Sequence, residues 1–130
     1  MFLGQEATYC GFPLNLEIQG VPDSQGWPTG LVKGAILSGM IQHKNGMPLF
    51  LFDTINNAGF SGGPVVVLEQ KKLKIIAVVS RYRFDTSAPV YAKTSAGDVE
   101  APNLYVKPNS GFMEAVPIAR ALGAARDAIG

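Results

Sequence analysis

Glycine and proline divide this chain into short segments, and that punctuation limits its fold more than any other feature. The 130 residues include 15 glycines and 9 prolines, with short apolar or alternating runs between them. Such spacing is typical of an all-β barrel or sandwich. We predict strands at residues 6–11, 31–42, 48–52, 63–68, 73–83 and 112–116, followed by one amphipathic helix at 118–129.

Two connections have the composition of hairpin turns. Residues 44–46 read Lys-Asn-Gly between two apolar runs, and Asn-Gly is a strong hairpin signal because both residues accept positive φ. Residues 69–72 form a charged link between two runs rich in valine and isoleucine. We expect these antiparallel pairs to follow one another as a meander. Phe50 and Phe52, two positions apart on one strand, should point to the same face and fill the core.

Two long connections remain, at residues 12–30 and 84–111. Both are rich in Pro, Gly, Ser, Asn and Asp, and connections of this length often carry binding residues. We predict that both are loops facing a ligand. Trp27 in the first is the aromatic residue to watch as a ligand or interface contact, although packing within the loop is the favoured explanation for it.

The charge and composition exclude several classes of protein. With 11 basic and 10 acidic residues the formal charge is +1, which provides no electrostatic footprint for nucleic acid or for an anionic membrane. No apolar run reaches the roughly 18 residues of a spanning helix, and the first six residues lack the basic and apolar regions of a signal peptide. One cysteine and one histidine form neither an internal disulfide nor a cluster with zinc-ligand spacing, so no metal or other cofactor is expected.

One glycine-rich segment has the composition of a catalytic turn. Residues 59–64 read Gly-Phe-Ser-Gly-Gly-Pro and lie between two buried runs. Glycines around Ser61 allow a tight bend and let backbone N–H groups converge on one point, which is the arrangement that stabilises a developing oxyanion. Ser61 would then be exposed as a nucleophile. A turn of this composition can also serve only to join two strands.

The segments around this turn resemble trypsin-like serine peptidases of bacterial type. Residues 59–64 resemble their Gly-x-Ser-Gly-Gly-Pro nucleophile loop, and the resemblance covers most of the chain. Residues 4–13 and 33–39 are similar to the first two strands of the family's second barrel, while 77–82 and 110–118 are similar to its last two strands. Residues 1–130 are therefore expected to form one domain, a single six-stranded antiparallel barrel that is the C-terminal half of a double barrel.

This resemblance implies a set of site residues. Ser61 would attack the scissile carbonyl, and the N–H groups of Gly59 and Ser61 would bind the oxyanion. An apolar Ile55 near the pocket floor would favour small or apolar substrate side chains, and Tyr82 would narrow the pocket where the family has glycine. Phe60 replaces the aspartate that pairs with a freed N-terminus in digestive members, so no such activation is expected. The implied substrate-binding residues are Ile55, Ser80, Arg81, Tyr82 and Gly111.

The family's histidine and aspartate come from a preceding barrel, which lies outside this sequence. His43 is the only histidine present, and its predicted hairpin lies roughly 15–20 Å from Ser61 along the intervening strand. Our leading hypothesis is the nucleophile-bearing half of a serine endopeptidase. It would act on polypeptides, be inactive alone, and associate with the N-terminal barrel or with itself through an exposed inter-barrel face. The alternative is a non-catalytic module that binds extended peptides along residues 80–82.

Overall fold

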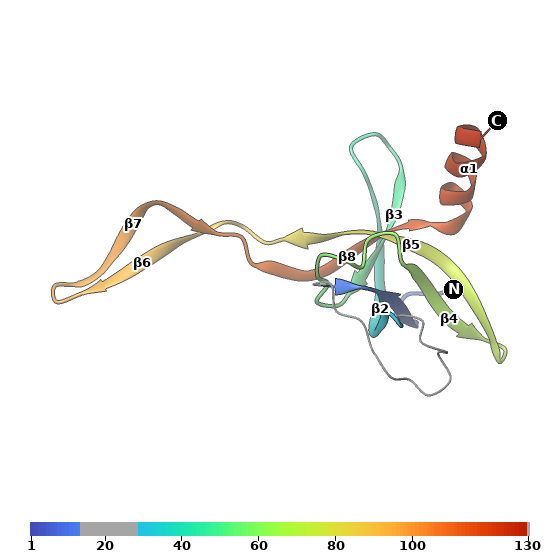
Figure 1. Ribbon diagram of the computed structural model, residues 1–130, viewed down its shortest axis with the longest axis horizontal. Helices are drawn as coiled ribbons and strands as arrows, with labels where there is room; N and C mark the ends of the chain where they lie inside the picture. Colours follow the sequence, from blue (N-terminus) through green and yellow to red (C-terminus); the bar gives the residue numbers. More distant parts are fainter. Residues whose placement is uncertain (14–28, 130) are drawn as a thin grey trace.

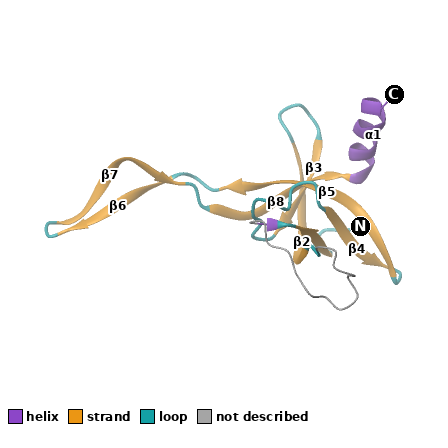
Figure 2. Ribbon diagram, in the orientation of Figure 1, coloured by secondary structure: helices purple, strands orange, loops and turns teal. Residues whose placement is uncertain are grey.

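The computed structural model describes residues 1–13 and 29–129 (Figures 1 and 2). Most of the connection at residues 12–30, including Trp27, lies outside the described residues. The described elements are β1 (Glu6–Gly11), β2 (Leu31–Gln42), β3 (Pro48–Asp53), β4 (Pro64–Glu69), β5 (Lys72–Phe84), β6 (Ala88–Thr94), β7 (Gly97–Val106), β8 (Asn109–Pro117) and α1 (Ile118–Ile129).

Six strands close an antiparallel barrel in the order β1-β2-β3-β8-β5-β4. This confirms the predicted all-β fold, with one six-stranded barrel and a C-terminal helix. Both predicted hairpins, β2–β3 and β4–β5, are present. The expected meander is wrong, because β3 pairs with β8 and β4 pairs with β1, so the two hairpins are not neighbours. The pairs Thr8 with Val66 and Tyr9 with Val65 close the barrel.

The core follows from the two-residue period of each strand. Side chains of a strand point alternately to its two faces, so residues two apart share the inner face of a closed barrel. Phe50 and Phe52 are both buried, as predicted, with ring centroids 6.4 Å apart in an edge-to-face arrangement. Each barrel strand contributes one such buried pair: Ala7 and Tyr9, Ala35 and Leu37, Phe50 and Phe52, Val65 and Val67, Ala77 and Val79, Met113 and Ala115.

The prediction that residues 84–111 form a loop is wrong. They contain β6 and β7, which pair as a separate two-stranded sheet and extend away from the barrel (Figure 1). At the base, the Asp85 N–H donates to the Pro108 carbonyl at 2.8 Å, and at the tip Gly97 turns with φ of +114°. We call residues 86–107 the arm. Both of its faces are largely exposed, so it lacks the buried-and-exposed alternation that marks a strand in a sequence.

Helix α1 ends the described chain and projects from the barrel beside β5 (Figure 1). Its predicted apolar positions are present, but none of its residues is buried, and Leu122 and Ile129 are 52% and 88% exposed. The barrel therefore leaves much of the apolar face of the helix uncovered. In the described part of the chain, no helix is long and apolar enough to cross a membrane.

Candidate functional site

Backbone hydrogen bonds tie the loop around Ser61 to the strands on both sides of it. The Gly62 N–H donates to the Val79 carbonyl at 2.8 Å, and the Val79 N–H donates back to the Gly63 carbonyl at 2.9 Å. On the other side, the Phe12 N–H donates to the Gly59 carbonyl at 3.0 Å. The loop is thus fixed against β5 and against the end of β1.

Close backbone approach explains why this loop is built from glycine. A Cβ on Gly63 would lie 1.9 Å from the carbonyl oxygen of Cys10, and a Cβ on Gly59 would lie 2.4 Å from that of Phe12. Gly59 and Gly62 also have φ of +99° and +88°, a region that side chains disfavour. The glycines therefore satisfy packing and conformation at the same bend.

Phe60 anchors the loop in the core. Its side chain is 1% exposed and its ring packs edge-to-face on Tyr9, with centroids 5.0 Å apart. The Lys33 ammonium lies 5.7 Å from the centroid of the Phe60 ring. Phe60 is therefore a core side chain, and it holds the neighbouring Ser61 at the surface.

Ser61 is exposed at the rim of two hollows of about 580 Å³ each. One lies between this loop and the β1–β2 side, and the other lies between the loop and the end of β5. Among the described residues, neither the Gly59 N–H nor the Ser61 N–H donates a backbone hydrogen bond. An amide without an internal acceptor can donate to an oxygen atom of a ligand, and two such donors are what an oxyanion site requires.

The second hollow brings together four of the residues implied by the resemblance. Gly59 and Ser61 line it from the loop, and Arg81 and Tyr82 line it from β5. Ser80 is exposed on β5 immediately before them.

Two implied substrate residues lie outside this lining. Ile55, expected near a pocket floor, is 65% exposed, and its carbonyl accepts a hydrogen bond from the Lys33 ammonium. The Gly111 carbonyl accepts a hydrogen bond from the Thr54 N–H at 2.8 Å. Neither residue lines the hollow beside Ser61.

The strand that carries Arg81 and Tyr82 has an edge without a barrel neighbour. β4 pairs with β5 only between Lys72 and Val78, whereas β8 pairs with β5 as far as Phe84. Beyond Val79, β5 therefore has β8 on one side and no paired strand on the other, within the described chain. This edge begins next to the Ser61 loop.

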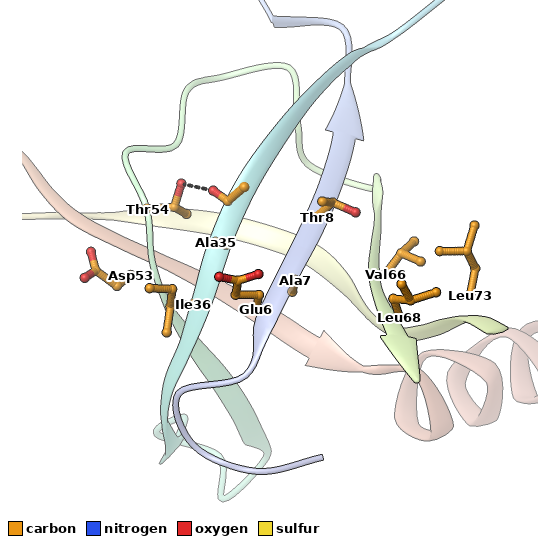
Figure 3. Close-up of a pocket in the computed structure, with 11 residues that line it drawn as sticks. Glu6, Ala7, Thr8, Ala35, Ile36, Asp53, Thr54, Val66, Leu68 and Leu73 are labelled. Atoms are coloured by element: carbon orange, nitrogen blue, oxygen red, sulfur yellow. Dashed lines mark hydrogen bonds between the residues drawn. The ribbon is translucent and has the colours of Figure 1, made fainter. Parts of the chain in front are cut away.

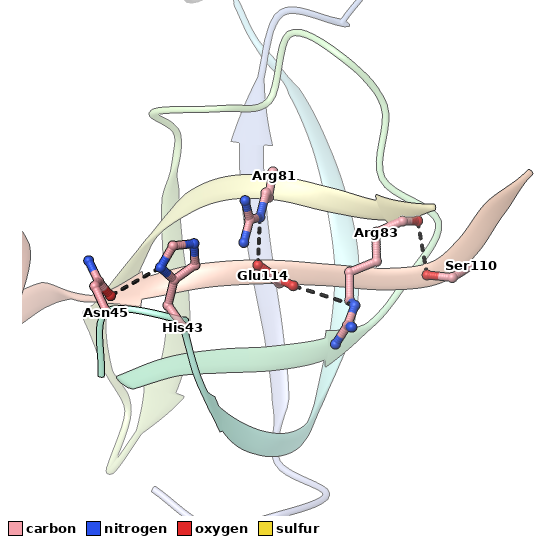
Figure 4. Close-up of polar contacts among 6 residues, drawn as sticks. All are labelled: His43, Asn45, Arg81, Arg83, Ser110 and Glu114. Carbon is pink, nitrogen blue, oxygen red and sulfur yellow. Dashed lines mark hydrogen bonds and ion pairs between the residues drawn. The ribbon is translucent and has the colours of Figure 1, made fainter. Parts of the chain in front are cut away.

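Glu114 is a site residue that sequence reasoning missed. It is 4% exposed, and its carboxylate contacts Arg81 Nε at 2.7 Å and Arg83 Nε at 3.5 Å (Figure 4). Its neighbours Met113 and Ala115 belong to the core, so Glu114 points to the outer face, where the two arginines cover it. The sequence held one signal for it, since Glu114 is the charged residue in the apolar run at 112–116. A carboxylate is almost never fully buried unless it is paired, so a buried Glu114 implies a cationic partner.

No base accompanies Ser61 in the described structure. His43 is half-buried at the β2–β3 turn, where its Nδ1 lies 3.0 Å from Asn45 Oδ1 (Figure 4). His43 lines neither hollow at Ser61, and among the described side chains none is hydrogen-bonded to the Ser61 hydroxyl. In the same described ranges, no three His, Cys, Asp or Glu residues are grouped to hold a metal ion.

A third hollow, of about 570 Å³, lies over β1, β2 and the β4–β5 hairpin (Figure 3). Glu6, Ile36 and Asp53 are register neighbours on three adjacent strands, so two carboxylates flank one isoleucine. The Thr54 hydroxyl donates to the Gly34 carbonyl at 3.0 Å in its wall. None of the implied site residues lines this hollow.

Comparison with known proteins gives no relative. No family model matches the chain, and no curated protein or solved structure matches it.

Proposed function

We propose that residues 1–130 form the nucleophile-bearing barrel of a serine endopeptidase. The observation that best supports this is the exposed Ser61 at a glycine bend where the Gly59 and Ser61 N–H groups donate no backbone hydrogen bond to another described residue. The resemblance of residues 59–64 to the nucleophile loop of trypsin-like peptidases supports it from the sequence. The unpaired edge of β5 beside the loop offers a place for an extended substrate.

The proposed reaction proceeds through an acyl-enzyme. Ser61 Oγ attacks the carbonyl carbon of the scissile bond and passes its proton to a histidine, which the N-terminal barrel supplies. The carbonyl oxygen gains the negative charge and accepts hydrogen bonds from the N–H groups of Gly59 and Ser61. Collapse of this intermediate breaks the C–N bond, and the histidine gives its proton to the leaving amine. Water then hydrolyses the ester and regenerates Ser61.

The chain alone is expected to be inactive. A serine hydroxyl without a general base is a poor nucleophile, and removal of the catalytic histidine in such a triad lowers kcat by about 10⁶. The half-site also lacks the substrate wall that the N-terminal barrel contributes. The proposal therefore requires a barrel carrying histidine and aspartate, joined to or bound by this chain.

A fluorophosphonate probe tests the proposal, because it reacts with activated serines. The chain is treated alone and within a longer protein that includes the barrel encoded upstream, and the labelled residue is identified by mass spectrometry. We expect labelling of Ser61 only in the longer protein, loss of labelling in Ser61→Ala, and full labelling in Ser38→Ala, which changes an exposed serine of β2 outside the site. Equal labelling of the isolated chain would contradict the proposal. So would an upstream reading frame that holds a stop codon or an unrelated domain.

A non-catalytic peptide-binding module is the second candidate. Two observations favour it: no described side chain activates Ser61, and β5 has an unpaired edge at residues 80–84. A strand-addition module would bind extended peptides equally well after Ser61→Ala. It would lose binding in Tyr82→Pro, which removes a backbone donor, and keep it in Tyr82→Phe.

A further inference from the structure

We infer that the hollow between the Ser61 loop and the end of β5 selects an acidic side chain of a polypeptide, through the guanidinium groups of Arg81 and Arg83. This names the substrate class of the proposed peptidase and rests on that proposal for its catalytic meaning. The expected affinity for an acidic side chain depends only on the arrangement of charges in the hollow.

The two arginines and one carboxylate leave net positive charge beside Ser61. Arg81, Arg83 and Glu114 all line the hollow, so its ionised side chains comprise two cations and one anion. The Glu114 side chain is 5% exposed, whereas those of Arg81 and Arg83 are 53% and 49% exposed. The cations therefore face an incoming ligand, and the anion lies beneath them.

The arginines retain donors that are suited to a carboxylate. Each contacts Glu114 through Nε, and no hydrogen bond joins a terminal guanidinium nitrogen of either arginine to another described residue. A guanidinium has five N–H donors in a planar fork that matches a carboxylate. Because Glu114 accepts a hydrogen bond from Arg81 Nε and forms a longer ion pair with Arg83 Nε, it orients both side chains before a ligand arrives.

An aromatic pair completes the wall. Tyr82 and Phe84 line the same hollow, with ring centroids 4.9 Å apart and an interplanar angle of 67°. Apolar rings next to the guanidinium groups reduce access of water, which strengthens attraction between opposite charges. They also offer contact to the methylene groups of a glutamate. The expected preference for apolar side chains depended on Ile55, which lies outside this hollow.

Peptide binding tests the inference without requiring catalysis. Labelled peptides with acetylated and amidated ends, identical except for one central Glu, Gln or Lys, are titrated against the chain by fluorescence anisotropy. We expect the Glu peptide to bind about tenfold more tightly than the Gln peptide, since exposed charged pairs contribute modestly, and the Lys peptide to bind least. Added salt should narrow the difference. A Gln peptide with a free C-terminal carboxylate tests whether the hollow recognises a chain end instead of a side chain. If this peptide and the Glu peptide both bind more tightly than the capped Gln peptide by the same factor, the side-chain assignment is overturned.

Three variants and a control identify the responsible charges. Arg81→Gln and Arg83→Gln should each reduce the ratio of Gln to Glu dissociation constants. Glu114→Gln should increase this ratio, because the net charge of the hollow rises while the arginines keep an amide oxygen as acceptor. A purely structural ion cluster would give no such increase. Arg120→Gln, which removes the same charge from the exposed surface of α1, should leave the ratio unchanged.

The inference is overturned if the chain does not prefer the Glu peptide, or if the preference survives replacement of both arginines. Circular dichroism confirms that each variant is folded. If Arg81→Gln unfolds the barrel, Arg83→Gln carries the test, because its contact with Glu114 is longer. Labelling of Ser61 with no preference for Glu would remove this inference and leave the peptidase proposal standing. A preference for Glu with no labelling of Ser61 in the longer protein would support the acidic-side-chain inference and contradict the peptidase proposal.

Discussion

Single residues around Ser61 are constrained by backbone packing. The glycines of residues 59–64 look, in a sequence, like a generic flexible turn. In the structure, Gly63 lies against the carbonyl of Cys10 and Gly59 against that of Phe12, so each position excludes a side chain. The motif is therefore a packing requirement of the barrel as well as a candidate catalytic bend.

Gly63→Ala tests this constraint. Its Cβ would lie 1.9 Å from the Cys10 carbonyl oxygen, so the backbone must shift, and we expect the free energy of unfolding to fall by about 3 kcal/mol. Gly34→Ala is the control, because a Cβ there meets nothing within 4 Å, and it should change stability by about 0.5 kcal/mol or less. Urea unfolding followed by circular dichroism measures both. Equal losses of stability in the two variants would show that the close approach of Gly63 to the Cys10 carbonyl does not exclude a side chain.

Tyr9 gives stability a dependence on alkaline pH. Burial raises the pKa of its phenol above the usual 10.0, and the hydrogen bond with Thr54 opposes this shift only partly. Above about pH 10 the unfolded chain loses this proton while the folded chain keeps it, so stability falls as the pH rises toward the folded-state pKa. Below pH 10 this contribution is fully present.

Tyr9→Phe should remove the part of the stability loss above pH 10 that comes from the Tyr9 phenol. Near neutral pH it should be less stable by about 1 kcal/mol, because the 3.1 Å hydrogen bond with Thr54 is lost. Tyr105→Phe, at a tyrosine that is 60% exposed, should retain the alkaline loss of the unmodified protein. Unfolding free energies measured on both sides of pH 10 decide this. Parallel pH profiles for Tyr9→Phe and the unmodified protein would contradict the assignment.

Among the secondary structure elements, the arm is the least integrated. β6 and β7 form their own sheet, and a two-stranded hairpin gains little stability in water without a packed face. The hydrogen bond between Asp85 and Pro108 brings the ends of the arm together at the barrel. The barrel should therefore fold without it.

Replacing residues 86–107 by an Asn-Gly turn should preserve the barrel. We expect cooperative unfolding and a free energy of unfolding within about 1 kcal/mol of the full chain, because the arm contributes none of the core pairs. Chemical denaturation monitored by circular dichroism provides the measurement. Loss of cooperative unfolding would contradict this expectation and would show that the arm and the barrel fold as one unit.

At the scale of the whole molecule, several large apolar side chains of the described residues are exposed. Leu122 and Ile129 on α1, and Leu68 and Leu73 on the β4–β5 hairpin, are all more than half exposed. Large exposed apolar patches commonly mark interaction surfaces. This agrees with the proposal that the chain binds an N-terminal barrel or, without it, another copy of itself.

We expect the isolated chain to self-associate. Its sedimentation coefficient should rise with concentration, and the double substitution Leu122→Gln with Ile129→Gln should weaken that rise, since both side chains lie on the uncovered face of α1. Ala124→Gln, at an exposed position away from that face, is the control. Sedimentation velocity over a range of concentrations is the measurement, and the longer protein with both barrels should remain monomeric. A monomeric isolated chain at all concentrations would contradict the expectation.

Local patterns in the sequence were enough to predict the barrel strands, both hairpin turns, the helix and the position of His43 at the first of these turns. Each depends on neighbours a few residues apart: alternation along a strand, Asn-Gly at a turn, or the helical spacing of Ile118 and Leu122. The glycine bend at Ser61 was predictable for the same reason. The function that this bend serves remains a proposal.

The tertiary structure alone decided which distant strands meet. Pairing of β3 with β8 and of β1 with β4 joins segments that no local pattern connects, and it replaced the expected meander. Pairing of β8 with β5 buries Glu114 beneath Arg81, 33 residues earlier in the chain, and so places a charged hollow beside Ser61. The arm escaped prediction because neither of its faces packs on a core. Side-chain alternation specifies which face of a strand is buried, whereas closure of the barrel specifies which strand lies beside it.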